Sequence, residues 1–274
     1  MDFKRLFLLL VTPLLSQYIW AAEVCDAGTF TLKYDEWVQI SLPCSPPENN
    51  ATVAGDDGKS GVFGDDIPGA FGTDWKVYYY DAAINNYVEL DKPHRELKRK
   101  RAYWIIQVTG EPGSSVELDM PEGSMDRVMD DSVNCISASG VLCFDIGLET
   151  DSGTHRWNMV GTPFDKTVGG KAFTYSVEDV LISANPIGGN VHACGPFVPG
   201  GCDLEQASTI DEPIAHNVLF RYDAGTESYE RITVAGGILN PWEGFWMASL
   251  AGADGRSPKF RFKYELDSIN SQEE

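Results

Sequence analysis

The chain has 274 residues, of which 41 are acidic and 21 are basic, so the formal net charge is −20. This excess of acid argues against a nucleic-acid-binding protein, because phosphate recognition needs a surplus of Lys and Arg on the contact face. Hydrophobic residues make up 43% and aromatic residues 11% of the chain, which is too much for a disordered protein. The length allows one large domain or two small ones.

Residues 1–22 predict a secretory signal peptide. Lys4 and Arg5 form a positive start, an apolar run follows over residues 6–15, and the small residues Ala21 and Ala22 mark a cleavage site. A helix that crosses a bilayer needs roughly 20 apolar residues, about twice the length of this run. We therefore expect a secreted, periplasmic or cell-surface protein with no membrane span after cleavage.

Six cysteines would remain after cleavage, and an even number in an exported chain favours disulfides. Two pairs are each eight residues apart, which favours pairing within them and leaves a third pair. Six cysteines nevertheless allow 15 pairings. No two have the short spacing of a structural zinc site, so we expect disulfides rather than zinc. The favoured pairs are Cys135–Cys143, Cys194–Cys202 and Cys25–Cys44.

An internal repeat determines the predicted organisation. Residues 80–107 match residues 222–249 without a gap, so that Tyr-Asp-Ala, a later Tyr and an aromatic-Trp pair coincide. Upstream, residues 37–43 match residues 157–163, each beginning with Trp and ending with Pro. The interval from this Pro to the Tyr-Asp pair is 80 − 43 = 37 residues in the first unit and 222 − 163 = 59 in the second.

The second unit therefore carries an insertion of about 22 residues that includes Cys194 and Cys202, and we expect a loop closed by their disulfide. The predicted organisation is a signal peptide over 1–22, a first unit over 23–125, a linker or hairpin over 126–142, and a second unit over 143–274.

The repeated motifs resemble those of a family of secreted bacterial and archaeal repeats, found in surface-layer, adhesin-like and other exported proteins. The family pattern is Trp-Asn-x-hydrophobic-Gly/Ser-x-Pro, then Asp-Ile/Val, then Tyr-Asp, then Gly-Tyr/Phe-Trp. The first unit has Val38 for Asn and Ala102 for Gly, and it has Ser41 where the second unit has Gly. The resemblance implies an exported β-rich repeat protein without an assigned activity. The second unit matches the pattern at Trp157, Asn158, Pro163, Gly244, Phe245 and Trp246.

Alternation of apolar and polar residues predicts strands, as at 76–80 and 259–264, where Phe260 and Phe262 share one face and Arg261 lies on the other. Asp81 and Asp223 are typical of turns that follow a strand. Only residues 176–184 indicate a helix. We therefore predict an all-β protein of two tandem repeated sandwich- or barrel-like units, the second with a disulfide-closed loop insertion.

The tryptophans divide into two groups. Four recur in register, and their recurrence favours a place in a core or between sheets over a sugar-stacking surface: Trp37, Trp104, Trp157 and Trp246. Trp75 and Trp242 do not match each other and border turns. We predict that these two form a ligand-stacking surface, extended by Tyr78 and Tyr79, with peripheral packing as the alternative.

No catalytic motif is evident, and the predicted function is not enzymatic. No cofactor is expected, although the acidic loop of the first unit carries oxygen ligands for calcium at Asp56, Asp57, Asp65 and Asp66. Solvated acidic side chains are the alternative. A basic cluster is predicted to bind an anion, a partner or the acidic second unit, with a solvated hairpin tip as the alternative: Arg95, Lys98, Arg99, Lys100 and Arg101.

These features favour an exported, non-catalytic binding or surface-assembly protein whose partner is an extracellular glycan or a matrix protein surface. A secreted hydrolase with its site between the two units is one alternative. A structural spacer module is another.

Overall fold

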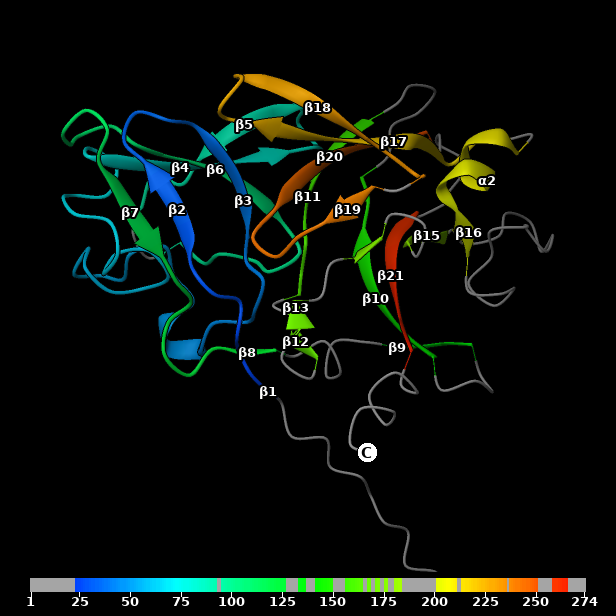
Figure 1. Cartoon of the computed structure of the whole chain (residues 1–274), viewed down its shortest axis with the longest axis horizontal. Helices are drawn as coiled ribbons and strands as arrows, with labels where there is room; N and C mark the ends of the chain where they lie inside the picture. The colour runs from blue at the N-terminus through cyan, green and yellow to red at the C-terminus, as the bar shows by residue number, and fades with distance from the viewer. Residues whose placement is uncertain are drawn as a thin grey trace, which may run out of the picture.

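A computed structural model describes most of the chain after residue 22 and is almost entirely β (Figure 1). The predicted signal peptide and Cys194 lie outside the described residues. The described residues are 23–92, 95–126, 133–136, 141–149, 156–164, 167–168, 171–172, 175–176, 180–183, 201–210, 213–235, 237–250 and 258–265.

The first half, residues 23–126, contains a four-stranded antiparallel sheet of order β3-β6-β4-β5 and two two-stranded sheets, β2-β7 and β1-β8. Short apolar segments separated by Gly- and Asp-rich turns produce these elements. Their bounds are β1 Glu23–Val24, β2 Phe30–Lys33, β3 Val38–Ser41, the 3₁₀ helix η1 Glu48–Asn50, β4 Trp75–Asp81, β5 Asn86–Glu89, β6 Ala102–Gln107, β7 Ser115–Leu118 and β8 Met125–Asp126.

The second half, residues 133–265, contains a four-stranded sheet of order β11-β20-β17-β18 and a five-stranded sheet of order β16-β15-β21-β10-β9, with the small pairs β12-β13 and β14-β19. Its elements are β9 Val133–Ile136, β10 Val141–Gly147, β11 Arg156–Gly161, β12 Thr167–Val168, β13 Lys171–Ala172, β14 Tyr175–Ser176, β15 Val180–Ser183, β16 Cys202–Asp203, α2 Leu204–Thr209, β17 Ala215–Asp223, β18 Ser228–Thr233, β19 Ile238–Leu239, β20 Gly244–Ser249 and β21 Lys259–Glu265.

The two four-stranded sheets have the same topology and the same register, apart from a β-bulge between Ala215 and Leu219 in the second. Tyr78 pairs with Trp104 in the first sheet, and the residues 142 positions later, Phe220 and Trp246, pair in the second (220 − 78 = 246 − 104 = 142). The tyrosine pairs of the hairpins, Tyr80 with Tyr87 and Tyr222 with Tyr229, obey the same shift. The repeat in the sequence is therefore a repeat in hydrogen-bonded structure.

The two hairpin turns also match. Asp81 and Asp223 each accept a hydrogen bond from the backbone N–H two residues on, at 3.0 and 2.9 Å, as the sequence predicted. Asn85 and Glu227, again 142 residues apart, both have a positive φ, of 54° and 51°. A left-handed residue at this point lets the chain reverse between the two strands.

Each half has its own core, and a third cluster joins them. On β6, Tyr103 and Ile105 face the core of the first half, whereas Ala102 and Trp104 face the second half. On β20, Phe245 and Met247 face their own core, whereas Trp246 faces the first half. All six residues of each strand are buried because each has a packed layer on both faces.

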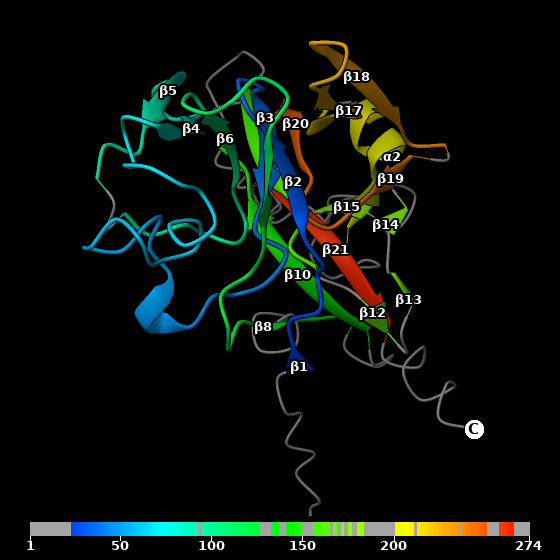
Figure 2. The same cartoon turned by 60° about the vertical axis from the view of Figure 1, so that its left-hand side comes forward.

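The halves meet at a local pseudo-twofold axis. Ile40 forms a β-bridge with Glu243, and Arg101 forms one with Val160, a position equivalent to Ile40 (160 − 40 = 120). At Gly161 an added Cβ would lie 2.5 Å from the Cβ of Ser41, so the absence of a side chain permits this close approach. From this contact the sheets diverge, with β5 and β18 at their outer ends (Figure 2).

Two local predictions from the sequence were wrong. Residues 176–184 form no helix where the structure describes them; instead Val180–Ser183 is strand β15, paired with β21. The β-branched Val180 and Ile182 favour the strand once a partner edge is available. In β21, Phe260 and Phe262 are buried as expected, but Arg261 on the other face is also buried. Its guanidinium binds both carboxylate oxygens of Asp145, at 2.6 and 2.9 Å.

The predicted Cys25–Cys44 disulfide is present and ties the first strand to the loop after β3. Cys202 is disulfide-bonded. Cys135 and Cys143 lie on the adjacent strands β9 and β10, and their side chains are outside the described part. Disulfides are typical of proteins that fold outside the cytosol. Within the described ranges, no helix is long and apolar enough to span a membrane.

Candidate ligand-binding groove

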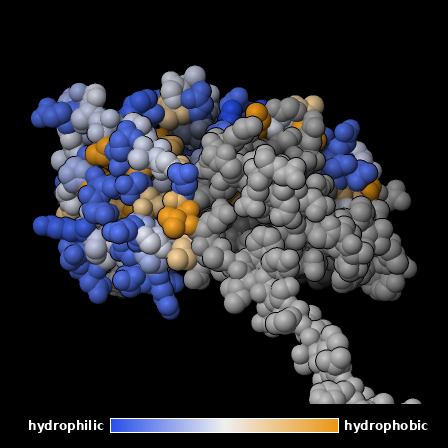
Figure 3. All heavy atoms as spheres, turned by 60° about the horizontal axis from the view of Figure 1, so that its bottom comes forward, coloured by the Kyte–Doolittle hydropathy of each residue, from blue (hydrophilic) through white to orange (hydrophobic). Residues whose placement is uncertain are grey.

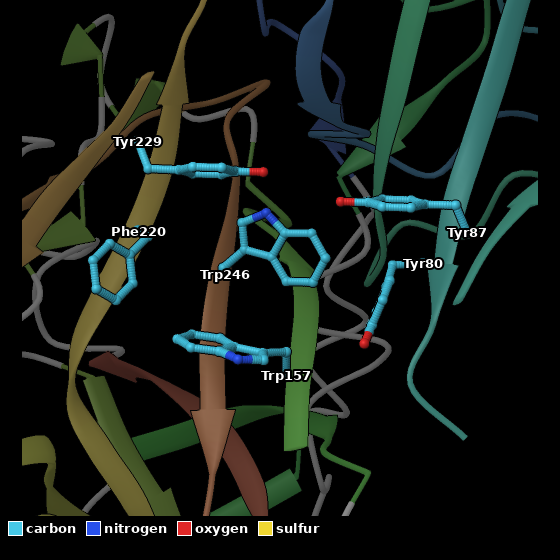
Figure 4. A pocket seen from close by; sticks show the side chains of 6 residues that line it. All are labelled: Tyr80, Tyr87, Trp157, Phe220, Tyr229 and Trp246. Carbon is cyan, nitrogen blue, oxygen red and sulfur yellow. The ribbon is translucent and has the colours of Figure 1, made fainter. Parts of the chain in front are cut away.

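Two neighbouring pockets lie in the groove where the four-stranded sheets diverge, and aromatic side chains line both. The larger, of about 420 Å³, is here called the Phe220 pocket (Figure 4). The smaller, of about 370 Å³, is called the Tyr78 pocket. Tyr80, Tyr87, Trp157, Phe220, Tyr229 and Trp246 line the first. Trp37, Tyr78, Tyr87, Trp104 and Tyr222 line the second.

The pseudo-twofold axis relates the two pockets. Each contains two tryptophans and two further rings of one half, one of them the hairpin residue Tyr87 or Tyr229, and is closed by a tyrosine of the other half. Trp157, Phe220 and Trp246 with Tyr80 form one set. The equivalent residues Trp37, Tyr78 and Trp104 with Tyr222 form the other. Tyr87 borders both pockets, so the groove is continuous.

The rings stand as walls rather than as a flat surface. Tyr80 and Trp246 meet edge to face at 4.8 Å and 74°, and the equivalent pair, Trp104 and Tyr222, meets at 4.8 Å and 73°. Trp37 is inclined at 83° to Trp104. Aromatic rings prefer such edge-to-face contacts. The ring faces that this leaves uncovered point into the pockets.

Both pockets are open to solvent at the mouth. Trp37 is 39% exposed, Tyr87 46% and Tyr229 49%, although all three are large apolar groups. The hydroxyls of Tyr87 and Tyr229 point toward each other above Trp246 (Figure 4). Burial, with the charge of Tyr87 as a further cause, raises the pKa of Tyr229 to about 12, so the Tyr229 hydroxyl stays protonated at neutral pH.

One polar group distinguishes the two indoles at the base of the groove. With its amide oriented to satisfy both neighbours, Gln39 accepts a hydrogen bond from Trp246 Nε1 at 3.2 Å and donates to the carbonyl of Gly244. The position equivalent to Gln39 is Met159, which faces Trp104 in the same cluster. Trp104 Nε1 is buried without a hydrogen-bond partner. The loss of one amide side chain explains this difference.

The rims of the pockets differ in charge at equivalent positions. Around the Tyr78 pocket stand three glutamates, Glu36, Glu89 and Glu227. The equivalent residues around the Phe220 pocket are Arg156, Arg231 and Asn85 (156 − 36 = 120; 231 − 89 = 227 − 85 = 142). The formal charges at these three pairs of positions are thus −3 and +2, and Lys33 and Lys76 form ion pairs with Glu36 and Glu89.

The tyrosines in the pockets respond to these charges. Burial first, then Glu227, Glu36 and Asp223, raises the pKa of Tyr222. Burial and a hydrogen bond to Glu89 raise the pKa of Tyr78. Burial and Tyr87 also raise the pKa of Tyr80, but the charge of Arg156 opposes that rise. The two pockets therefore offer similar shapes with opposite electrostatic environments.

The prediction that Trp75 and Trp242 stack on a ligand was wrong. Trp75 is 0% and Trp242 3% exposed, and both pack in the core of the first half, so neither offers a ring face to solvent. Trp242 reaches this core from the second half, and its indole N–H donates to the carbonyl of Ala27 at 3.2 Å. Neither has a tryptophan at its equivalent position in the repeat, because both fill the core of the first half only.

The two predicted tyrosines separate. Tyr78 lines its pocket, as proposed from the sequence. Tyr79 points to the opposite face of β4, where the guanidinium of Arg101 lies 4.3 Å from its ring centre. Only alternate residues of a strand can share a surface, so the two could not both belong to one site.

The basic cluster divides into two parts, because Arg95, Lys98 and Arg101 line one cavity of the first half whereas Arg99 and Lys100 do not. Arg99 is 6% exposed and donates through Nε to the carbonyl of Pro163 at 2.8 Å. Lys100 Nζ lies 4.5 Å from the ring centre of Phe144. These two cations therefore contact the second half, one of the roles predicted from the sequence. Arg95 lies 3.7 Å from Asp91, and Lys98 is exposed.

The four carboxylates of the acidic loop have different surroundings. Asp57 Oδ1 accepts hydrogen bonds from the backbone of Lys59 and Ser60, and Asp66 accepts one from the N–H of Asp119. Asp56, Asp57 and Asp65 line one cavity of the loop. Among the residues that the structure describes, no three His, Cys, Asp or Glu side chains gather to hold a metal ion. Backbone contacts account for the two bonded carboxylates.

The end of the molecule that carries β1 and β8 differs from the groove. There the described surface of the first half is mostly hydrophilic, with small separate hydrophobic areas (Figure 3). Such scattered areas are ordinary on a monomer, whereas a groove lined by adjoining aromatic rings marks a binding surface.

Comparison with known proteins adds no relative: no family model, no curated protein and no solved structure matches the chain. The site is therefore argued from its own geometry.

Proposed function

We propose that this chain is an exported, non-catalytic binding protein that recognises an extracellular glycan or matrix surface through the aromatic groove. The observation that carries this proposal is the pair of pockets related by the pseudo-twofold axis, each with ring faces open to solvent. Sugar rings and other compact ligands with apolar faces bind by stacking on such side chains.

The composition of the lining supports binding rather than catalysis. All the residues that line the two pockets are Phe, Tyr or Trp. General acid–base or nucleophilic chemistry at neutral pH uses carboxylates, imidazoles or activated hydroxyls. The hydroxyls of Tyr78, Tyr80, Tyr222 and Tyr229 have raised pKa values and favour the protonated state.

A glycan array with the mature protein tests this function. Trp37→Ala and Trp157→Ala each remove one equivalent wall, and Ile84→Ala changes an exposed apolar residue that lines neither pocket. We expect at least tenfold weaker binding of any array ligand to one or both tryptophan variants and unchanged binding to Ile84→Ala. Unchanged array binding by both tryptophan variants, or no binding by the wild-type protein, would contradict the proposal.

A further inference from the structure

We propose that the Tyr78 pocket binds an organic cation of the quaternary ammonium type and that the Phe220 pocket excludes it. The inference rests on the proposed function, because it names the ligand chemistry of one part of the same groove. Three observations carry it: the arrangement of the rings, the charges of the rim and the internal comparison between the pockets.

The rings of the Tyr78 pocket form a cage. Trp37 meets Tyr78 at 61° and Trp104 at 83°, and Tyr222 meets Trp104 at 73°, with centre distances of 4.8 to 6.4 Å. A cation surrounded by several ring faces is attracted by each, and a methylated ammonium loses little hydration on entering such a cage. The volume of about 370 Å³ accommodates a trimethylammonium group with part of its carrier.

The rim adds carboxylates where a cation would enter. Glu36 immediately precedes Trp37, and Glu89 pairs with Tyr78 across β4 and β5. Lys33 lies 3.2 Å from Glu36, and Lys76 lies 3.6 Å from Glu89. Such solvent-exposed ion pairs are weak, so the carboxylates remain available to a cation held by the rings. Glu227 adds a third negative charge from the opposite hairpin.

The Phe220 pocket provides the contrast. Arg156 stands at the position of Glu36, and its Nη1 donates to the carbonyls of Ala82 and Ala83, at 2.6 and 2.9 Å, which holds the guanidinium beside the hairpin of Tyr80. Arg231 pairs with Phe220 as Glu89 pairs with Tyr78. A cation entering this pocket would meet two like charges, which oppose binding.

The first experiment is a titration of the mature protein with choline chloride, followed by tryptophan fluorescence and calorimetry at constant ionic strength. The neutral isostere 3,3-dimethyl-1-butanol has the same shape without the charge. We expect choline to bind at least tenfold more tightly than the isostere. Equal affinity for the two, or no binding of choline, would overturn the inference.

Matched variants locate the site. Trp37→Ala should weaken choline binding at least tenfold, whereas the equivalent Trp157→Ala should change it less than twofold. Glu36→Arg, which copies the rim of the other pocket, should weaken it about fivefold. If Trp157→Ala has the larger effect, the assignment to the Tyr78 pocket is wrong. Near-native thermal unfolding of each variant excludes a folding defect as the cause.

A vesicle experiment distinguishes the molecules that could carry the quaternary ammonium group. Sedimentation with phosphatidylcholine vesicles, against phosphatidylglycerol vesicles as control, detects a lipid headgroup; binding of choline in solution with no vesicle binding indicates a free or glycan-linked group. Both results support the cage. If array glycans bind through Trp37 and Trp157 but choline does not bind, the proposed function stands and this inference fails.

Discussion

The two pockets of the groove share their rings but not their rims. Five aromatic positions recur in register and line the pockets, and seven of these ten rings also pack in the cluster that joins the halves. The rim residues lie outside this cluster, and glutamate in one pocket is replaced by arginine or asparagine in the other. Packing between the halves thus conserves the shape of the pockets and leaves their charge free to vary.

The largest loss of stability should come from removing Trp242, which belongs to the second half but packs in the core of the first half. Its equivalent is Lys100, which contacts Phe144 of the second half (242 − 100 = 142). Trp242→Ala should lower the free energy of unfolding by about 3–5 kcal/mol, because it leaves a cavity in a buried core. Lys100→Ala should cost about 1 kcal/mol or less. Urea unfolding measures both, and equal losses would show that the two contacts are energetically alike.

A smaller loss is expected at the pseudo-twofold axis. In Gly161→Ala the new Cβ would meet Ser41 Cβ at 2.5 Å and the carbonyl of Arg101 at 2.8 Å. This should lower the free energy of unfolding by about 1–3 kcal/mol. Gly147→Ala, on a strand where nothing lies within 4 Å, is the control and should be neutral or slightly stabilising. A tolerated Gly161→Ala would mean that the halves do not meet as closely as described.

A gain is expected from making the base of the groove symmetric. Met159→Gln places an amide opposite Trp104, as Gln39 stands opposite Trp246. Satisfying the buried Trp104 Nε1 should raise the free energy of unfolding by about 0.5–1.5 kcal/mol. Thermal unfolding measures the change, and the double variant Gln39→Met, Met159→Gln should recover the wild-type value to a first approximation. A loss of stability in Met159→Gln would show that positions 39 and 159 are equivalent in backbone but not in the surroundings of their side chains.

The smallest effect concerns the acidic loop of the first half. Burial is the main cause that raises the pKa of Asp66 from 3.8 to about 6, and the negative charges of Asp119 and Asp65 add to it. A hydrogen bond from the backbone N–H of Asp119 acts in the opposite direction and lowers the pKa. Between these values the folded chain retains a proton that the unfolded chain releases. Asp66 therefore makes stability fall as pH rises from about 4 to 6 and leaves it lower above pH 6.

Asp66→Asn should remove this dependence, raising the melting temperature at pH 7 relative to the wild type and leaving it nearly unchanged at pH 4. Asp57→Asn is the contrast, since backbone and side-chain hydrogen bonds lower the pKa of Asp57. If Asp66→Asn has the same effect at both pH values, the carboxyl is not buried as described.

The repeat was sufficient to predict the paired sheets, because Tyr80, Tyr87 and Trp104 recur at a constant spacing that a shared strand register requires. It also favoured a core or inter-sheet place for all four recurring tryptophans, which is right for the buried Trp104 and Trp246 and wrong for Trp37, which is 39% exposed at the mouth of its pocket. It did not reveal the groove, since whether a recurring ring is covered or open depends on the angle at which the sheets diverge. Trp75 and Trp242 were misplaced because a tryptophan without a repeat partner is compatible with a surface or with a core. The charge contrast of the rims was already visible in the aligned repeats.

The pseudo-twofold contact has a consequence for specificity. Two separate copies of one subunit would form an isologous interface, and every substitution in such a dimer would appear in both pockets at once. When both copies lie on one chain, a substitution changes one pocket only. Linking them also makes their association intramolecular, so it no longer depends on protein concentration. The covalent connection therefore converts two obligatorily identical pockets into a pair whose shapes and charges can differ.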